Sequence, residues 1–385
     1  MLKPYYDEVV SSLKPTFLDY SDIVIEIAET SFLDFDILIK VQDEIIKLGT
    51  VLETDYHLED TPVLKSLEQI AELIYKKSIG QDDVSDELIR VALGLYSDFQ
   101  SSISVSEGKL ALVLIIKDEA DYIKEWLEFH LMLGVDHFYI YDNESTDCLK
   151  DVLRTYIEKG IVTYHFWPGR FQQINVYDHA LHRYKYDTVY MGFIDTDEFL
   201  IPVIDEDIPT AIDRIFNDFE EKDVRNKNAG GIGINWRIYG TSFHKEKPKG
   251  MVIENYKYRA KDDYLHNCHI KVICKPILVK QFQWHPHNVE YIDDSIVTIS
   301  EKGSEITGPY FYDNRDEILR LNHYYTRSEK EFYYKTKVRG WADSSPDQID
   351  KEYLEKVISR IGEGNDLYDP ICDKYIDALK KRIDS

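Results

Sequence analysis

Hydrophobic residues follow two different patterns along the chain. Up to about residue 105 they recur at helical spacing, and the segment that opens with Thr61-Pro62 shows this most clearly, with Leu64, Leu67, Ile70, Leu73 and Ile74. Steps of three and four residues place these side chains on one helix face, and proline is favoured at the first helical position. No cluster of acids or histidines accompanies the pattern. We therefore predict a helical N-terminal module over residues 1–105 that supplies no catalytic group.

From about residue 106 apolar runs alternate with amphipathic segments. The run Leu110–Ile116 has no polar alternation, which is typical of a strand buried on both faces. A helix is predicted from Asp121 to Leu133, and later strands are predicted at residues 137–141, 161–165 and from Val189 onwards. Strands that alternate with helices indicate a parallel α/β sheet. We expect this domain to cover residues 106–345, with antiparallel additions beyond Pro202, and a C-terminal helical tail over residues 346–385.

The fourth of these strands runs into two aspartates, Asp195 and Asp197. In open α/β sheets ligands bind at the carboxyl ends of strands, and residues two apart in a strand point the same way, about 6.6 Å apart. Two carboxylates about 4 Å apart repel by about 4 kcal/mol at an effective dielectric constant near 20, and a shared divalent cation reverses that repulsion. We therefore predict a metal-binding pair, with a pair of solvated acids at a strand end as the simpler alternative.

Polar residues also follow the first two strands of the predicted sheet. Lys117 and Glu119 follow the first strand, and Asp142 and Asn143 follow the second. An acid in the position of Asp142 can accept a hydrogen bond from a nucleobase or a ribose. The glycine-rich fingerprints of dinucleotide and P-loop sites are absent, so any phosphate must be held by a metal and by cationic side chains.

Composition and charge argue against several kinds of partner and cellular location. A net charge of −25 and a pI near 4.9 argue against a nucleic-acid partner, because binding phosphates needs a basic surface. No segment approaches the roughly 20 apolar residues of a membrane helix, and the first residues lack the apolar core of a signal peptide. The four cysteines show no disulfide pattern. We expect a cytoplasmic protein, in solution or peripheral at the inner face of the membrane.

A series of motifs runs through the chain in a fixed order: Ile115–Glu119, Glu125–His130, Tyr139–Asp147, Phe193–Leu200, Asn235–Ser242, Lys271–Pro276, Pro286-His287 and Leu321–Tyr325. Together they resemble glycosyltransferase family 92 and its bacterial relatives of the family 2-like class. The resemblance covers residues 108–345. It implies an α/β fold of the GT-A type, with a nucleotide-sugar site on the parallel half and an acceptor site on the C-terminal half.

The resemblance also implies a reaction. It points to a metal-dependent, inverting glycosyltransferase that moves a sugar from a nucleotide donor, most simply a UDP-sugar, to a glycan, a glycolipid or another hydroxyl acceptor. The departing diphosphate gains negative charge, and Mn²⁺ or Mg²⁺ held by carboxylates suits that charge. Two alternatives are a phosphohydrolase that uses Asp195 as nucleophile and a carbohydrate-binding protein without turnover. Phosphohydrolases of that kind place the motif on the first strand of the domain, whereas here it ends the fourth.

Carried over position by position, the resemblance assigns roles to individual residues. The nucleotide-sugar residues would be Lys117, Glu119, Asp142, Asn143, Asp195, Lys271, Lys275 and Arg339. Lys271 and Lys275 share one strand face at i and i+4 and could both meet the diphosphate. The metal ligands would be Asp195, Asp197 and His323, with His287 as the competitor of His323. The acceptor residues would be Trp236, Arg237 and Trp284.

The general base that takes the acceptor proton is less clear from the sequence. Asp262, Asp263, His244 and Glu290 are all candidates, and none stands out. His266, Cys268, His269 and Cys274 could form a zinc site, but their spacing matches no standard zinc motif. We interpret those four as ordinary residues of strands.

Overall fold

The computed structural model describes residues 16–17, 19–29, 35–56, 62–81, 84–102, 109–185, 187–222, 228–313, 316–340 and 351–384. The chain divides into two compact units, Met1–Val105 and Ser106–Ser385. Each unit has its own hydrophobic core. No helix in the described parts of the chain is long and apolar enough to cross a bilayer.

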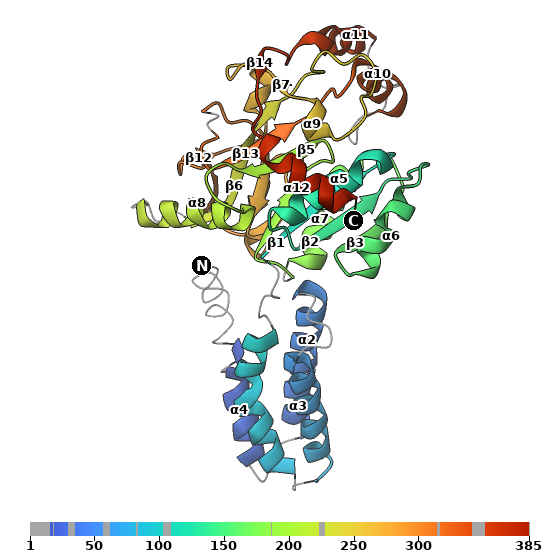
Figure 1. The fold of residues 1–385 in the computed structure, drawn as a ribbon. Coiled ribbons are helices and arrows are strands. Elements are labelled where there is room, and N and C mark those ends of the chain that lie inside the picture. Colours follow the sequence, from blue (N-terminus) through green and yellow to red (C-terminus); the bar gives the residue numbers. More distant parts are fainter. Residues whose placement is uncertain are drawn as a thin grey trace. The chain divides into compact units, whose positions relative to one another are not determined.

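The first unit is helical, as its periodicity indicates (Figure 1). Its main helices are α2 (Phe35–Tyr56), α3 (Pro62–Ser78) and α4 (Ser85–Ser102), and α3 begins at the proline. The apolar stripe of α3 is buried against the other helices, with Leu67, Ile70 and Ile74 almost completely shielded from solvent. Burying a leucine or isoleucine side chain contributes about 1.5–3 kcal/mol, so this stripe holds the helices together.

The second unit is built on a mixed sheet (Figure 1). Among the described residues ten strands form it. Their order is β12 (Glu305–Ile306), β11 (Ile296–Ile299), β6 (Asn228–Ile238), β8 (Ile270–Cys274), β4, β1, β2 and β3, with β13 (Leu319–His323) beside β5 and β6. The first five strands in the chain are β1 (Leu110–Ile116), β2 (His137–Asp142), β3 (Val162–Phe166), β4 (Tyr190–Phe193) and β5 (Glu198–Pro202). Strands β4, β1, β2 and β3 are parallel neighbours. The predicted parallel α/β half is therefore confirmed.

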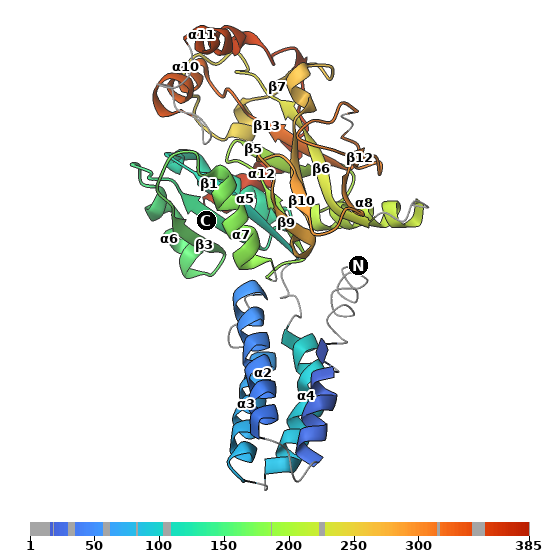
Figure 2. The ribbon, with the colours of Figure 1, turned by 180° about the vertical axis from the view of Figure 1, so that it is seen from behind.

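Helices cover both faces of this parallel half. They are α5 (Ala120–Met132), α6 (Leu149–Glu158), α7 (Gln173–Tyr184) and α8 (Ile208–Lys222). Along β1, Leu110, Leu112 and Leu114 pack in one core with α5, α6 and α8, whereas Ala111 and Val113 pack in another with α7. Figure 2 shows α7 lying over that second face. An apolar strand without alternation is thus buried on both sides, as predicted.

Beyond α8 the strands run in both directions. They are β6 (Asn228–Ile238), β7 (Tyr258–Arg259), β8 (Ile270–Cys274), β9 (Val279–Phe282), β10 (Val289–Tyr291), β11 (Ile296–Ile299), β12 (Glu305–Ile306) and β13 (Leu319–His323). Strand β8 is antiparallel to both β4 and β6. It therefore starts, rather than ends, at the edge where β4 finishes.

Among the additions beyond Pro202 we expected a strand around residues 252–259, but only its end, β7, is a strand and its first half is a short helix. The segment that includes Val252 and Ile253 forms α9 (Val252–Asn255). The buried carboxylate of Glu125, on α5, accepts hydrogen bonds from the backbone N–H groups of Val252 and Ile253 at 2.7 and 3.1 Å. These bonds satisfy N–H groups that the first turn of a helix leaves without partners. A contact from a distant helix therefore caps the N-terminus of this segment.

The C-terminal residues that we expected to form a separate tail belong to the second unit. They contain α11 (Lys351–Ser359), β14 (Leu367–Tyr368) and α12 (Ile376–Ile383), and α10 (Glu329–Tyr334) precedes them. Strand β14 pairs with β7, and α12 packs against α5. Cys372 and Leu379 are buried in the main core of the unit. The segment is thus largely helical, as predicted, and it packs against the rest of the second unit.

Candidate active site

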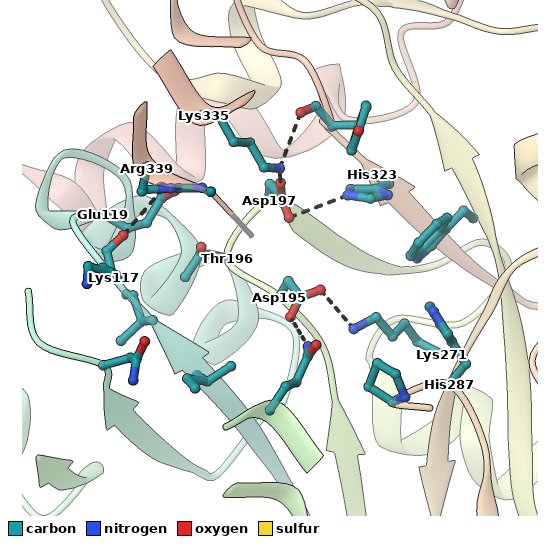
Figure 3. A pocket seen from close by; sticks show the side chains of 18 residues that line it. Lys117, Glu119, Asp195, Thr196, Asp197, Lys271, His287, His323, Lys335 and Arg339 are labelled. Atoms are coloured by element: carbon teal, nitrogen blue, oxygen red, sulfur yellow. Dashed lines mark hydrogen bonds and ion pairs between the residues drawn. The ribbon is translucent and has the colours of Figure 1, made fainter. Parts of the chain in front are cut away.

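A cavity opens at the carboxyl ends of β1 and β4, beside β8, β13 and the π-helical segment η4 (Lys335–Arg339) (Figure 3). Charged and titratable side chains dominate its wall, namely Lys117, Glu119, Asp195, Asp197, Lys271, His287, His323, Lys335 and Arg339. Ligand sites at the carboxyl ends of parallel strands are the rule in open α/β sheets. The cavity is therefore the candidate site.

Asp195 and Asp197 lie in the turn between β4 and β5, not on a strand. Strand β4 ends at Phe193 and β5 begins at Glu198, so the strand alternation that we expected to align the two carboxylates does not apply. The backbone N–H of Glu198 donates to the carbonyl oxygen of Asp195 at 3.0 Å and closes the turn. Both carboxylates nevertheless point into the cavity (Figure 3).

Glu198 lies fully buried behind this turn and holds its shape. Its Oε2 accepts a hydrogen bond from the backbone N–H of Asp195 at 2.8 Å, and its Oε1 accepts one from the Nε1–H of Trp236 at 2.6 Å. Burial raises the pKa of Glu198 to about 8, although the neighbouring Lys271 lowers it. Glu198 is thus a buried support of the turn and not part of the cavity wall.

Helix α5 anchors the strand that follows the turn. The Nε1–H of Trp126 donates to the carbonyl oxygen of Glu198 at 2.8 Å, and Nε2 of His130 accepts from the backbone N–H of Leu200 at 3.1 Å. Burial lowers the pKa of His130 to about 3, so the ring is neutral and can accept that bond. The Glu125–His130 motif therefore has a structural role: it fixes the position of β5 and of the aspartates before it.

Asp195 is paired with a buried lysine. Its Oδ2 accepts a hydrogen bond from Nζ of Lys271 at 2.8 Å, and its Oδ1 accepts one from Nε2 of Gln173 at 3.1 Å. Lys271 is 1% exposed. Burial alone lowers the pKa of Lys271, but Asp195 and Glu198 raise it well above its ordinary value. The lysine is therefore charged, and it holds Asp195 in one orientation.

Asp197 contacts a different pair of side chains. Its Oδ2 accepts a hydrogen bond from Nζ of Lys335 at 2.6 Å, and its Oδ1 lies 3.5 Å from Nε2 of His323. Burial alone raises the pKa of Asp197, but Lys335 and His323 lower it well below its ordinary value. Burial also lowers the pKa of His323 more than Asp197 raises it. The site therefore combines an ionised carboxylate with a neutral imidazole.

A third acid, Glu119, joins two arginines at the rim. Its Oε2 accepts a hydrogen bond from Nη1 of Arg327 at 2.7 Å, and its Oε1 is paired with Nη1 of Arg339. Burial alone raises the pKa of Glu119, but Arg327 and Arg339 bring it below its ordinary value. The pairing of Glu119 with Arg339 ties η4 to the end of β1.

The donors around Asp197 fit a hard divalent cation. Cis ligands of a cation with bonds of about 2.1 Å lie about 3 Å apart, close to the separation of Asp197 Oδ1 and His323 Nε2. A carboxylate and an imidazole are both ligands that Mn²⁺ accepts. In the described parts of the chain no three His, Cys, Asp or Glu side chains form a ready-made metal cage, so a bound ion would need ligand oxygens and water as well.

The predicted nucleotide residues fall into two groups. Lys117, Asn143 and Arg339 line the cavity, as Glu119, Asp195 and Lys271 do. Asp142 does not line it, because its two oxygens accept hydrogen bonds from the backbone N–H of Ser145 and the hydroxyl of Tyr164. Asp142 therefore stabilises the loop after β2, and its neighbour Asn143 faces the cavity.

Lys275 lies far from the cavity, which corrects its predicted role. It shares a strand face with Lys271, but β8 runs away from the site, so four residues carry Lys275 about 13 Å along the strand. Its side chain is buried against α8, with Nζ 4.1 Å from the ring centre of Phe216 and 3.7 Å from Glu220. Burial lowers the pKa of Lys275 to about 8. The direction of β8, which the sequence does not show, separates the two lysines.

The predicted acceptor residues also lie in different places. Trp236 lines the cavity, and its ring stacks on His269 with centroids 4.8 Å apart. Arg237 faces elsewhere, since its guanidinium donates to Asp316 at 2.7 and 2.9 Å. Trp284 lines a neighbouring groove. Successive residues of a strand point to opposite faces, which explains why Trp236 and Arg237 separate.

None of the four candidate bases lines the cavity. Asp262 pairs with Arg259 at 2.7 Å, and Glu290 pairs with Lys280 at 2.6 Å. His244 contacts the backbone oxygen of Asn255 at 3.2 Å, and Asp263 is exposed. Those expectations rested on residue type alone, and the fold places these side chains elsewhere.

Several residues of the site were not predicted. Lys335 and Tyr325 line the cavity, Gln173 holds Asp195, and Arg327 holds Glu119. Tyr325 belongs to a motif that we noted without giving it a role. The others carry no local signal, because each reaches its partner from a distant part of the chain.

Comparison with known proteins gives the following matches. The sequence profile described as glycosyltransferase family 92 matches residues 114–356, more than half of the chain. A glycosyltransferase family 92 protein of Ricinus communis is 24% identical over 218 residues, which are 56% of this chain and 35% of the relative. The β-1,4-galactosyltransferase galt-1 of Caenorhabditis elegans is 25% identical over 220 residues, 53% of this chain and 48% of the relative. The chain thus spans between a third and a half of these relatives.

Two alignments with solved structures are as follows. The S. aureus protein TarS in complex with UDP aligns with a TM-score of 0.30 at 13% identity, covering 44% of this chain and 47% of that one. Glucosyl-3-phosphoglycerate synthase from Mycobacterium tuberculosis, in complex with Mn²⁺, UDP and glucosyl-3-phosphoglycerate, aligns with a TM-score of 0.28 at 14% identity, covering 53% and 74%.

Proposed function

Because the chain belongs to glycosyltransferase family 92, we propose that it transfers a sugar from a nucleoside diphosphate donor to a hydroxyl group of an acceptor, with inversion at the anomeric carbon. In such a transfer the bond between the anomeric carbon and the diphosphate oxygen breaks, and the acceptor oxygen forms the new bond. The diphosphate departs with increased negative charge, and the acceptor hydroxyl gives its proton to a general base. The site therefore needs cations near the diphosphate.

The observation that carries this proposal is the charge around Asp195 and Asp197. Lys271, Lys335 and Arg339 all line one cavity with these two acids. Cationic side chains that are already oriented stabilise the developing charge of a leaving group without having to reorganise. In the described structure each aspartate is paired with one lysine. Both lysines would therefore already be oriented when phosphate oxygens bind.

We further propose that Mn²⁺ or Mg²⁺ binds at Asp197 and His323. When bound there, the cation would neutralise charge on the diphosphate. Asp195 would remain with Lys271 and accept a hydrogen bond from the ribose. His287 is the weaker candidate ligand, because it lies on the Lys271 side of the cavity, away from Asp197 (Figure 3).

The donor is proposed to be a UDP-sugar. Two matched relatives are named β-1,4-galactosyltransferases, galt-1 and the galactan enzyme of Arabidopsis thaliana. UDP-galactose is therefore the first donor to test, followed by UDP-glucose and UDP-N-acetylglucosamine. Slow donor hydrolysis can be measured without an acceptor, which makes it a suitable first assay.

Calorimetric titration of UDP tests the metal and the nucleotide together. The full chain should bind UDP in the presence of Mn²⁺ and lose most of that affinity in EDTA. Asp197→Asn should remove most Mn²⁺-dependent binding, because the carboxamide carries no charge. Equal UDP affinity with Mn²⁺ and with EDTA would exclude the metal, and no binding of any nucleotide in either condition would overturn the proposed function.

A further inference from the structure

A groove adjoins the donor cavity on the side of Asp195. The two share Gln173, Pro286 and His287, and Gln173 itself donates to Asp195. The outer part of the groove is lined by Phe171, Trp284 and Tyr310. A molecule in this groove would therefore lie next to the donor, within reach of the reacting sugar.

The aromatic side chains of the groove are unusually open to solvent. Trp284 is 80% exposed, and Phe171 and Tyr310 are 46% and 45% exposed. Trp284 is held edge-on against the ring of His285, with centroids 4.6 Å apart. Aromatic rings supply much of the binding energy in recognition sites, and gathered exposed apolar surface marks a site of interaction. Rings of this kind can pack against the C–H faces of a sugar.

His285, which lines the same groove, has an unsatisfied polar atom. The side chain is 5% exposed, and its Nδ1 accepts a hydrogen bond from the backbone N–H of His287 at 3.3 Å. A neutral imidazole that accepts at Nδ1 carries its proton on Nε2. That Nε2 is buried and has no hydrogen-bond partner among the described residues. A buried donor without a partner costs free energy, and a ligand hydroxyl oxygen would satisfy it.

The groove also lacks formal charge. The described residues that line it include no Asp, Glu, Lys or Arg. The wall of the donor cavity beside it instead contains acids, lysines and an arginine (Figure 3). An anionic ligand would find no cation in the groove, whereas an uncharged, hydroxyl-rich ligand would find aromatic faces and a hydrogen-bond donor.

We infer that this groove binds an uncharged hexose unit of a saccharide acceptor, with Trp284 as the stacking platform and His285 Nε2–H as a hydrogen-bond donor to a hydroxyl oxygen. The role of the bound saccharide as an acceptor rests on the proposed function, since an acceptor must lie beside the donor. Saccharide binding itself can be measured without nucleotide or metal.

The test is a calorimetric titration of the full chain with neutral tetrasaccharides of galactose, glucose and mannose, and with tetragalacturonate as the charged comparison. At least one neutral tetrasaccharide should bind at concentrations up to about 10 mM, more tightly than tetragalacturonate. Trp284→Ala should weaken this binding at least about tenfold. His285→Phe, which keeps a ring but removes the donor, should weaken it at least about threefold.

Two controls distinguish binding in the groove from binding to exposed rings elsewhere and from damage to the donor cavity. Phe243→Ala removes a ring that is 66% exposed and lines neither the donor cavity nor the groove, and it should not change saccharide affinity. Trp284→Ala should bind UDP with Mn²⁺ like the unaltered chain. Absence of binding by all neutral tetrasaccharides, tighter binding of tetragalacturonate, or equal affinity in Trp284→Ala would each overturn the inference. Absence of UDP binding by the unaltered chain, with saccharide binding intact, would instead contradict the proposed function.

Discussion

Nζ of Lys335 lies 2.6 Å from Oδ2 of Asp197, although 138 residues separate them in the chain. The contact joins η4 to the turn between β4 and β5. It also means that a cation of the protein already occupies one oxygen of the carboxylate proposed to bind metal. Lys335 and a divalent ion should therefore compete for Asp197 until a diphosphate binds and its oxygens accept hydrogen bonds from Lys335.

Replacing Lys335 with methionine tests this competition. Lys335→Met should bind Mn²⁺ alone more tightly, because Asp197 loses its internal partner. It should bind UDP in the presence of Mn²⁺ at least about tenfold more weakly, about 1.4 kcal/mol, because a phosphate ligand is lost. Titration of Mn²⁺ followed by electron paramagnetic resonance, and calorimetry with UDP, give the two affinities. Lys337→Met, on the same segment but outside the cavity wall, is the matched control and should change neither.

The two histidines of the cavity should differ in their effect on metal binding. His323 lies 3.5 Å from Asp197, whereas His287 lies beside Lys271 (Figure 3). His323→Ala should weaken Mn²⁺-dependent UDP binding by at least about 1.4 kcal/mol, a tenfold change in affinity. His287→Ala should leave most of it. If the effects are reversed, His287 is the ligand.

Loss of the buried lysine should destabilise the second unit. Lys271→Met leaves Asp195 without the cation that neutralises it. Removing one partner of a buried ion pair costs about 3–5 kcal/mol, and the 31% exposure of the Asp195 side chain places the expected cost at the lower end of that range. Lys280→Met breaks the exposed pair with Glu290 and should cost no more than about 1 kcal/mol. Calorimetric unfolding of the three proteins gives the comparison. A Lys271→Met protein as stable as Lys280→Met would show that the pair does not support the fold.

Glu125 should make the stability of the second unit depend on pH. Burial raises its pKa to about 7 from the ordinary 4.5, although hydrogen bonds from Val252 and Ile253 lower it. A folded-state pKa above the unfolded one contributes stability that is complete below pH 4.5 and is lost as the pH rises towards 7. The loss amounts to about 3 kcal/mol, since one pKa unit corresponds to about 1.4 kcal/mol.

The variant Glu125→Gln, which cannot ionise, isolates this effect. Between pH 5 and pH 7 the melting temperature of the unaltered chain should fall relative to that of Glu125→Gln, and above about pH 8 the difference should stay constant. Differential scanning calorimetry at several pH values measures both. Parallel curves over the whole range would show that Glu125 titrates normally in the folded protein.

Local patterns in the sequence were enough to predict the parallel half of the sheet and the position of its acidic turn. Strand β1 occupies the predicted residues Leu110–Ile116, because an uninterrupted apolar run must be covered on both faces. Proline at the start of α3 and the apolar stripe that follows it indicate a helix from neighbouring residues alone. Asp195 and Asp197 could be placed at a ligand-binding edge because the end of β4 is visible in the sequence.

Only the tertiary structure decided which charges meet. Lys271 reaches Asp195 and Lys275 does not, because β8 runs antiparallel to β4, and periodicity is the same for either direction of a strand. Lys335 contacts Asp197 because η4 packs against the turn, and Glu125 caps α9, where a strand was expected. Each of these contacts joins residues far apart in the chain. Their energies depend on burial and distance, which no local pattern of residues records.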